Sequence, residues 1–531
     1  MNSFRHWIFL ALIFVLPLGA LAQAAPGTQT VLVFPFDNST HQPGLEWISE
    51  AFPEILGQRL STQSLFLISR DDRQYAFDRM GIPVNLHASR ATLYRIAAEM
   101  DADFIVLGSY TYDGQTFTAH AQVLDMKALH LSSDQVESGP LSQFVAIQTA
   151  LAWDVLRLMR PKFSESRQAF LQQAPAIRLD AFENYIRGVL AGASADKIRF
   201  LKTAVAIDPK YSQPVLLLAK TYFAAHDYDQ AAFYLAKLPS DDPGYSEASF
   251  LLGLSEYHLG HFDKASAAFK ATAERVPLTE VLNNIGVAES RRSHHDAADY
   301  FQKAVEADPS DPDYHFNLAL ALYHKGDTPA SQRQLHETLT LSPGDAEARQ
   351  FQDALLINPS PAIPPLRLKS NYDESSYRQL SVELQNAIDE SIGKAKPSAQ
   401  ASLHLERARE LLANGAAREA EGQFREALSQ EPDNPEALAG LAHALLLEMK
   451  FAEARRQAEA SLAWEATAEA FLVVARADFH DKDRDGAEQN LQKALALEPA
   501  SPDAKALAQE IQSQPPESQP GQSQPAAGGP Y

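Results

Sequence analysis

The residues whose types and spacing come closest to a chemical site are three alternate aspartates and a glycine: Asp481, Asp483, Asp485 and Gly486. This order is that of a calcium-binding loop, in which carboxylates and a glycine-assisted turn wrap a hard cation. Such loops place a bidentate glutamate at the twelfth position, where this chain has Gln492. The same residues also fall where a turn between two helices is expected. The sequence therefore favours a turn over a calcium site and predicts no bound cofactor.

Motifs of the common enzyme classes do not occur in the sequence. It has no glycine-rich phosphate loop, no dinucleotide-binding fingerprint, no G-x-S-x-G nucleophile elbow and no H-E-x-x-H zinc pair. It also has no cysteine, which excludes disulfides, a thiol nucleophile and a lipid-modified cysteine. Four histidines lie in one helical stretch, but nothing in their spacing brings them to one point: His258, His261, His294 and His295. We therefore predict a protein that is not an enzyme and holds no transition metal.

The middle and the end of the chain are organised as repeats of about 34 residues, a period typical of stacked helix-turn-helix units. Small residues, aromatic residues and a proline recur in register: Ala219, Tyr222, Tyr228, Ala231 and Pro243 in one unit, and Gly253, Gly260, Phe262, Ala265, Phe269 and Pro277 in the next. The small residues let two helices pack closely, while the rings fill the space between units. The pattern resembles the tetratricopeptide repeat, which implies extended concave surfaces that bind peptides or proteins.

A first array of these repeats is predicted over residues 178–357, in about five units. The unit at 178–209 is atypical, and regular units begin near four residues: Ser212, Ser246, Leu278 and Pro312. The third unit is one residue short in the turn between its helices, where His294 and His295 stand. That turn is expected to be distorted or functional.

A linker and a second array follow. Residues 358–365 contain four prolines and cannot remain helical, so residues 358–400 are predicted to be a proline-rich linker followed by a lone helix. Residues 401–512 form a second array of about three units with a capping helix. Residues 513–531 are rich in Gln, Ser, Pro and Gly and are expected to be disordered.

The inner surface of the first array is the predicted binding site. In repeats of this kind the first helix of each unit lines the groove, and the side chains expected there combine rings with a few hydrogen-bond donors, which suits an extended peptide. They are Lys220, Phe223, Phe250, Tyr257, His258, Asn283, Arg291, Phe316, Tyr323 and His324. Lys220, Asn283 and Arg291 could meet main-chain carbonyls or a terminal carboxylate. The alternative is that several of the rings belong to the core.

Residues 27–165 have a different pattern, that of an α/β domain. Apolar runs at 31–36 and 65–69 flank a helical pattern at 45–60, and a second helix at 89–100 leads into a strand at 104–110. Asp113 and Gly114 suit a two-residue hairpin turn. The next strand alternates, with Phe117, Ala119, Ala121 and Val123 on one face, so one face of the sheet is expected to be covered. A helix at 141–159 closes the domain.

The segments 31–40, 44–60, 65–72 and 102–125 resemble, in order and spacing, the TolB amino-terminal-like domain family. The resemblance covers nearly all of residues 27–165. It implies a two-layer or three-layer α/β domain that is often fused to tetratricopeptide repeats, and it implies no catalytic residue. The β-propeller of TolB itself is missing, because helical repeats follow instead. The predicted fold is therefore multidomain, with this α/β domain followed by two all-α superhelical arrays.

A second candidate site lies where the first strand of this domain ends. Ligands of open α/β sheets bind outside the carboxyl ends of strands, where this chain has Asp37, Asn38 and Trp47. The alternative is structural, since aspartate and asparagine commonly shape turns and tryptophan commonly fills a core.

The N-terminus and the overall charge indicate where the protein acts. Arg5 and His6 precede the apolar run from Trp7 to Leu16, and the small residues around Ala22 suit signal peptidase, so residues 1–22 are predicted to be a cleaved signal peptide. The alternative, an uncleaved anchor, is disfavoured because the run falls short of the roughly 20 residues that span a bilayer. A net charge of −22 argues against nucleic acid or anionic lipid as a partner.

These features together predict a periplasmic or secreted protein that is not a lipoprotein and has no integral membrane segment after cleavage. Its predicted function is that of a non-catalytic scaffold or adaptor that binds protein or peptide partners in the cell envelope. The alternative is a small-molecule sensor or an enzyme centred on the α/β domain.

Overall fold

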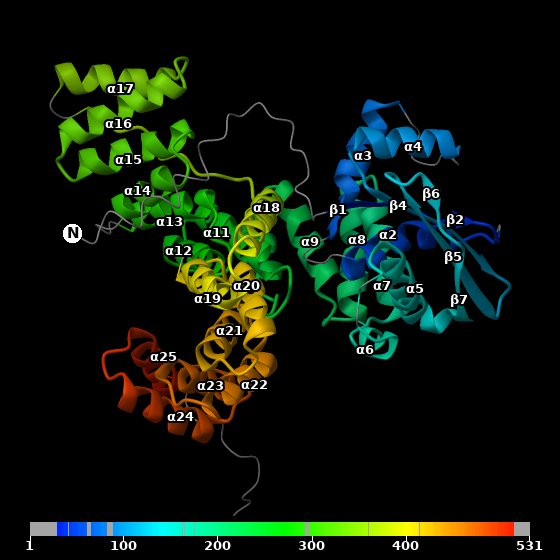
Figure 1. Ribbon diagram of the computed structural model, residues 1–531. Coiled ribbons are helices and arrows are strands. Elements are labelled where there is room, and N and C mark those ends of the chain that lie inside the picture. Colours follow the sequence, from blue (N-terminus) through cyan, green and yellow to red (C-terminus); the bar gives the residue numbers. More distant parts are fainter. Residues whose placement is uncertain are drawn as a thin grey trace, which may run out of the picture. The chain divides into compact units, whose positions relative to one another are not determined.

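The computed structural model describes residues 29–513 except 41, 61–64, 82–88, 162, 164, 175, 293–296, 359–360 and 414. The chain divides into two compact units, Met1–Asp389 and Glu390–Tyr531 (Figure 1). The predicted signal peptide, the turn with His294 and His295, and the predicted tail from residue 514 onward lie outside the described residues. None of the described helices combines the length and the apolar composition that crossing a membrane requires.

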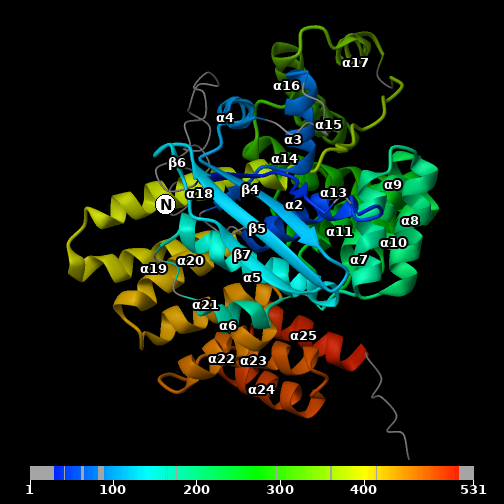
Figure 2. The same ribbon diagram turned by 90° about the vertical axis from the view of Figure 1, so that its right-hand side faces the viewer.

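A mixed sheet forms the centre of the N-terminal domain, as predicted. Its strands are β1 (Gln29–Val33), β2 (Asp37–Asn38), β3 (Leu65–Leu67), β4 (Phe104–Tyr112), β5 (Thr116–Asp125), β6 (His130–Leu131) and β7 (Gln135–Pro140). β1 pairs in parallel with β3 on one side and β4 on the other, while β5 pairs antiparallel with β4, β6 and β7. The long β4–β5 hairpin runs through the middle of Figure 2. The parallel pair β1–β3 enclosing a helix is the predicted β-α-β opening.

Helices cover both faces of the parallel half of this sheet. They are α2 (Trp47–Leu60), α3 (Arg70–Arg79), α4 (Arg90–Glu99) and, after the short turn η1 (Leu141–Gln143), α5 (Phe144–Met159). Val31 and Val33 pack into the core with α2 and α5, whereas Leu32 between them packs with α3 and α4. Successive strand side chains point to opposite faces, so this alternation builds three layers. The expected alternation in β5 is also present, because its apolar face packs on α5 and the other face stays partly exposed.

Two details differ from the sequence-based expectation. The hairpin after β4 is longer than two residues, since Tyr112 pairs with Phe117, and the Asp113 carboxylate accepts hydrogen bonds from the main-chain N–H groups of Gln115 and Thr116. Gly114 has φ +98°, which favours glycine. Helix α3 and strands β6 and β7 were not predicted from the sequence, because α3 has a polar composition and the two strands are short or weakly apolar.

The short helix α6 (Arg167–Gln172) packs on α5, and the first array follows in the same unit. Its helices are α7 (Leu179–Leu190), α8 (Ser194–Ile207), α9 (Ser212–Ala224), α10 (Tyr228–Leu235), α11 (Tyr245–His258), α12 (Phe262–Ala273), α13 (Thr279–Arg291), α14 (Ala297–Ala307), α15 (Pro312–His324), α16 (Thr328–Leu341) and α17 (Ala346–Ile357). A β-carbon on Gly286 would lie 2.7 Å from the ring of Phe301, so only glycine allows this helix crossing.

The α/β domain and the first array share one hydrophobic core. Trp47 of α2 packs edge-on against Phe182 of α7, with ring centroids 6.2 Å apart. The hydroxyl of Tyr185 donates a hydrogen bond of 2.9 Å to Glu54, also in α2. The core continues from β1 through these helices as far as α13. The α/β domain is therefore packed directly against the first helices of the array.

The second unit is an all-helical array, as predicted. α18 (Glu374–Gly393) spans the division between the units, and α19 (Pro397–Ala413), α20 (Ala417–Gln430), α21 (Pro435–Leu447), α22 (Phe451–Leu462), α23 (Ala468–His480), α24 (Arg484–Leu497) and α25 (Pro502–Ser513) follow. Phe424 and the alanines around it form its core, and Leu507 and Ile511 of α25 close the far end.

Candidate functional site

The predicted linker does not run free of the first array. Residues 361–373, here called the groove segment, have neither helix nor strand and lie against α11, α13, α15 and α17. Figure 1 shows this segment as the yellow-green coil that leads into α18. Its earlier residues contact the later helices of the array and its later residues contact the earlier helices. The segment therefore runs back along the array, antiparallel to the order of the repeats.

Asparagine side chains of α13 and α15 hold the main chain of this segment. The carboxamide of Asn317 donates to the carbonyl of Arg367 at 2.7 Å and accepts from its N–H at 2.8 Å. Asn284 makes the same pair of bonds with Lys369, at 2.7 and 2.9 Å. Asn283 donates a further bond of 3.0 Å to the carbonyl of Arg367. Each carboxamide thus makes the hydrogen bonds that a neighbouring strand would make to an extended main chain. These bonds do not depend on the side chains of the bound segment.

The side chain of Arg367 ends in a ring of carboxylates. Its guanidinium makes two bonds to Asp345, at 2.7 and 3.0 Å, and further bonds to Asp313 at 2.9 Å and Glu347 at 3.2 Å. The guanidinium carbon lies 3.6 Å from the ring centre of Phe316, within cation–π range. Planar bidentate pairing of this kind is specific to arginine.

Lys369, two residues further on, occupies a second acidic pocket. Its ammonium donates to Asp311 and to Asp313, both at 2.7 Å, and lies 5.1 Å from the ring centre of Tyr314. Burial alone would raise the pKa of Asp313, but hydrogen bonds from Lys369 and Arg367 outweigh it and hold that pKa below its ordinary value. Asp313 is therefore shared by both basic residues and stays charged.

The end of the segment reaches the earlier helices of the array. The ring of Tyr372 lies 5.3 Å from that of Phe250 in α11, and the N–H of Asp373 donates to Glu280 in α13 at 3.2 Å. The hydroxyl of Tyr372 donates to Glu374 at 2.5 Å. Burial, with Glu374 adding to it, raises the pKa of this hydroxyl. The tyrosine therefore stays neutral.

The carboxylates of the groove come from two positions of the repeat, the N-caps Asp311 and Asp345 and the first helical turns. The first turns of α11, α13, α15 and α17 each carry an acidic residue, and these residues stand one repeat apart: Glu247, Glu280, Asp313 and Glu347. Burial opposes ionisation of Asp345 as well, but hydrogen bonding to Arg367 lowers its pKa. The groove is therefore an acidic track with amide groups beside it.

Three of the residues predicted to line the groove contact the segment. They are Phe250, Asn283 and Phe316, all without exposed surface. Lys220 instead pairs with Glu247 at 2.6 Å. The others lie toward the opposite end of the first helices or beside them: Phe223, Tyr257, His258, Arg291, Tyr323 and His324.

Those remaining residues are occupied by other parts of the array. His258 stacks on Tyr228 with ring centroids 4.4 Å apart, and Arg291 lies over Phe262 at 4.9 Å. Burial lowers the pKa of His258.

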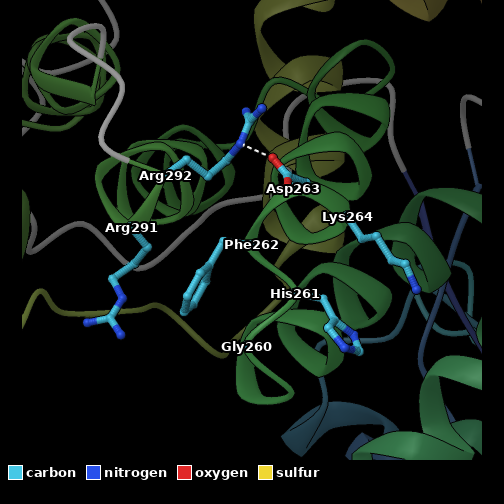
Figure 3. Close-up of a pocket in the computed structure, with 7 residues that line it drawn as sticks. All are labelled: Gly260, His261, Phe262, Asp263, Lys264, Arg291 and Arg292. Atoms are coloured by element: carbon cyan, nitrogen blue, oxygen red, sulfur yellow. Dashed lines mark hydrogen bonds and ion pairs between the residues drawn. The ribbon is translucent and has the colours of Figure 1, made fainter.

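A shallow hollow lies beside the turn between α11 and α12 (Figure 3). Arg291 and Arg292 point apart there, with Arg292 paired to Asp263 and Arg291 directed along Phe262. Arg292 also binds the buried Glu289 at 2.8 Å. His261 and Lys264, which also line the hollow, pair with Glu256 at 2.6 and 3.6 Å.

Family comparison identifies the repeats. Two family models described as tetratricopeptide repeat match the chain, one at residues 191–253 and 411–477 and the other at residues 287–346. The helical arrays are built from tetratricopeptide repeats. Proteins with these repeats are generally scaffolds for protein–protein interaction. The comparison with curated proteins finds no match.

Several solved tetratricopeptide structures are similar to part of the chain. MamA from Desulfovibrio magneticus RS-1 is 18% identical with a TM-score of 0.30, over 32% of this chain and 99% of that one. YrrB, described as a TPR protein with an unusual peptide-binding site, is 16% identical with a TM-score of 0.31, over 33% and 92%. A tetratricopeptide repeat protein from Parabacteroides merdae is 12% identical with a TM-score of 0.25, over 57% and 98%.

Sequence reasoning missed most of the groove. It did not single out Asn284, Asn317, Asp313, Arg367 or Lys369. The signals were present, because the two asparagines stand at the same place in successive tetratricopeptide repeats, two residues before the small residue at the helix crossing. The two basic residues stand at alternate positions in a segment that the sequence assigned to a linker, so nothing local connected them to the array.

Of the candidate residues of the α/β domain, Asp37 and Asn38 lie on a short strand and Trp47 lies in the core. Asp37 and Asn38 form β2, which pairs with β4, and the side-chain carboxamide oxygen of Asn38 accepts a 3.0 Å bond from the N–H of Thr40. Trp47 is 3% exposed and packs edge-on against Phe144, with centroids 5.6 Å apart. Trp47 is thus a core residue in this structure and presents no surface to a ligand.

Of the three aspartates of the calcium-like motif, Asp481 and Asp483 lie in the turn between α23 and α24, and Asp485 lies in the first turn of α24. The Asp483 carboxylate accepts a 3.0 Å bond from the N–H of Gly486 and caps α24. Asp481 pairs with Arg455 at 3.0 Å. Across the described residues, no three acidic or histidine side chains converge on a point that could hold a metal ion. The contacts of these aspartates are those of an inter-helix turn.

Proposed function

We propose that this protein is a non-catalytic scaffold of the cell envelope that binds extended segments of partner proteins in the groove of its first tetratricopeptide array. The observation that carries the proposal is the pair of asparagines, Asn284 and Asn317, which bind the N–H and C=O groups of alternate residues of an extended chain. Main-chain recognition of this kind selects a conformation, and the acidic pockets beside it select side chains. Catalysis would need groups that converge on a reacting atom, and the groove instead spreads its groups along a track.

The location and architecture in this proposal come from the N-terminal part. Residues 1–22 act as a signal peptide, the mature chain begins at Gln23, and the protein acts in the periplasm or outside the cell. Residues 27–165 form a TolB-like module. Because its core is continuous with the first array, it presents a second surface in a fixed orientation to the groove. The protein would join an envelope component held by this module to one held by the array.

Affinity capture from the envelope fraction of the native host tests this function. The tagged full-length chain is compared with Asn284→Ala/Asn317→Ala and with Asn371→Ala, which changes an exposed asparagine of the groove segment. We expect a mature N-terminus at Gln23 and a specific set of proteins, part of which the double variant alone loses. An unprocessed chain that remains in the cytoplasm would refute the location. Failure of every form to recover a specific protein would refute the scaffold.

A further inference from the structure

Resting on the function proposed above, we propose that the groove segment is an internal ligand, and that the partner it competes with presents an extended segment with two basic residues at alternate positions. The segment itself defines this chemistry. Arg367 and Lys369 bind through their main chains to Asn317 and Asn284, and through their side chains to carboxylates. A partner with the same spacing and direction would meet every one of these groups.

The acidic track requires cations that its own repeats do not supply. In the first regular unit, the residue after the small Ala219 is Lys220, which neutralises Glu247 of the next unit. In the following units, the residues at this place are apolar and buried: Leu254, Val287 and Leu320. The carboxylates that follow them in the groove therefore lack a cation from the preceding repeat, and the groove segment provides two.

Removal of the segment would leave several acidic side chains facing one another. Asp313 and Asp345 have side-chain exposures of 32% and 10%, and Asp311 has 21%. Like charges held together and partly shielded from water disfavour ionisation of one another. A replacing chain must therefore carry positive charge, which excludes acidic peptides and polyanions. Arginine suits the pocket of Arg367, because that pocket binds both edges of the guanidinium.

The segment lies at the surface of the array, although the side chains of Leu366, Leu368 and Tyr372 pack against its hydrophobic clusters. None of the residues from 362 to 373 is fully buried, and the side chains of Arg367 and Lys369 are 20% and 17% exposed. Its main chain is held by side chains of the groove rather than by a helix or strand. A chain bound in this way can be exchanged for another without unfolding the repeats.

The tether makes the segment a strong competitor. Residue 361 lies only a few positions after the end of α17 at Ile357. A ligand on a short tether has an effective concentration on the order of millimolar, so a partner in solution must bind more tightly than the segment or reach the groove when it is vacated. Occupation by the segment would thus set a threshold for binding.

Fluorescence anisotropy tests this proposal with a labelled peptide of the sequence 361–373. The proteins are the full chain, Arg367→Glu/Lys369→Glu, which places acidic residues against the acidic track, and Lys210→Glu/Arg333→Glu, which makes the same charge change at exposed positions. We expect the groove variant to bind at least about tenfold more tightly than the other two proteins, because its groove is vacant. A peptide with glutamate at both basic positions should not bind.

Three results would overturn the proposal. Equal affinity of the groove variant and the full chain would show that the segment does not compete. Equal binding of the charge-reversed peptide would show that the groove does not select basic residues. Concentration-dependent dimers of the full chain, lost in the groove variant, would assign the occupant to a second copy instead of a different protein.

A measurement on the unaltered protein covers the case in which the groove variant misfolds. Hydrogen exchange of the full chain should show protected N–H groups at Arg367 and Lys369, and excess peptide should accelerate their exchange. Unchanged protection at saturating peptide would overturn the competition. If the peptide does not bind while envelope proteins are still captured, the scaffold function is supported and only the proposed chemistry of the partner is refuted.

Discussion

The two arrays place acidic residues at the same point of the repeat but neutralise them differently. In the second array, the residue after the small residue of the first helix pairs with an acidic residue of the next unit: the guanidinium of Arg409 with Glu436, and a ring nitrogen of His443 with Glu469 at 2.7 Å. In the first array, this internal pairing stops after Lys220, and Asp313 and Glu347 receive cations from the groove segment. In the second array, these acidic residues therefore pair with side chains of neighbouring repeats. In the first array, the groove segment supplies their partners.

The amide groups differ in the same way. Asn284 and Asn317 stand two residues before the small residue of their helices, and the second array has Gly440 and Val473 at that place. Neither can hold a peptide main chain through its side chain. Both arrays thus share one repeat framework. A few side chains on one face of the first helices make it a peptide groove in the first array alone.

Charge reversal of Arg367 should give the largest difference between the arrays. Arg367→Glu sets a fourth carboxylate against Asp313, Asp345 and Glu347, and we expect it to destabilise the first unit by roughly 3 kcal/mol, because a partly buried pair becomes a repulsion. Arg409→Glu makes the same change at a side chain that is 50% exposed and should cost less than about 1 kcal/mol. Chemical denaturation, with hydrogen exchange as the readout for each unit, measures the loss of stability in both variants. Equal losses would contradict the distinction between the arrays.

Removal of one asparagine should have a smaller effect confined to the first array. Asn317→Ala leaves the N–H and C=O of Arg367 without these partners, and the cost of an unsatisfied group is about 1–3 kcal/mol. Asn371→Ala, at an exposed position of the same segment, should change stability by less than about 0.5 kcal/mol. Thermal unfolding gives the stabilities, and exchange at Arg367 reports the release of the segment. Unaltered exchange in Asn317→Ala would mean that the amide does not hold the segment.

Replacing one carboxylate by an amide should destabilise the first unit but stabilise the second. The folded-state pKa of Asp345 is lowered, so its contribution is present above the ordinary aspartate pKa and is lost as pH falls through the folded-state value. Asp345→Asn should therefore destabilise the first unit by about 1–2 kcal/mol at neutral pH and by progressively less below about pH 4. Thermal unfolding as a function of pH measures this difference. A loss that persists at the lowest pH would point to packing instead of charge.

The pKa of Glu448 in the second array is raised, whereas that of Asp345 is lowered. Burial and the neighbouring Glu421 raise the pKa of Glu448 to about 7, so the folded chain binds a proton that the unfolded chain releases above the ordinary value of 4.5. Stability of the second unit should therefore fall as pH rises from 4.5 to about 7. Glu448→Gln, which keeps a donor toward Glu421, should stabilise the unit by about 1 kcal/mol at pH 8 and leave it unchanged at acid pH. A pH-independent effect would contradict the shared proton.

The sequence predicted the repeat framework well, because its signals are local. Small residues at helix crossings, such as Gly286, and the alternation in β5 depend on neighbours within one helix or strand. The β-α-β opening and both arrays followed from such patterns. Strands β6 and β7 were missed because their residues are stabilised by pairing with β5 and carry little pattern of their own.

The groove was predicted only in part, because its contacts join distant residues. Phe250, Asn283 and Phe316 were found from their place on the first helices, but the asparagine at 284 meets a chain 85 residues further on. The proline-rich sequence after α17 correctly excludes a helix, yet the same property is compatible with a free linker or a bound strand. Only the acidic residues repeated at one position would have indicated a basic ligand.

The smallest expected effect tests whether the arrays differ outside the groove. Asp327 and Asp483 each cap the second helix of a repeat, accepting a 3.0 Å bond from a main-chain N–H three residues later. Replacing either aspartate by alanine should lower the stability of its unit by about 1 kcal/mol. The two losses should be equal, because each aspartate accepts the same N-cap hydrogen bond. Asp483 also belongs to the calcium-like motif, so the melting temperature is measured with and without calcium. Stabilisation by calcium of the unaltered chain, lost in Asp483→Ala and retained in Asp327→Ala, would assign this turn a cation and give the second array a site of its own.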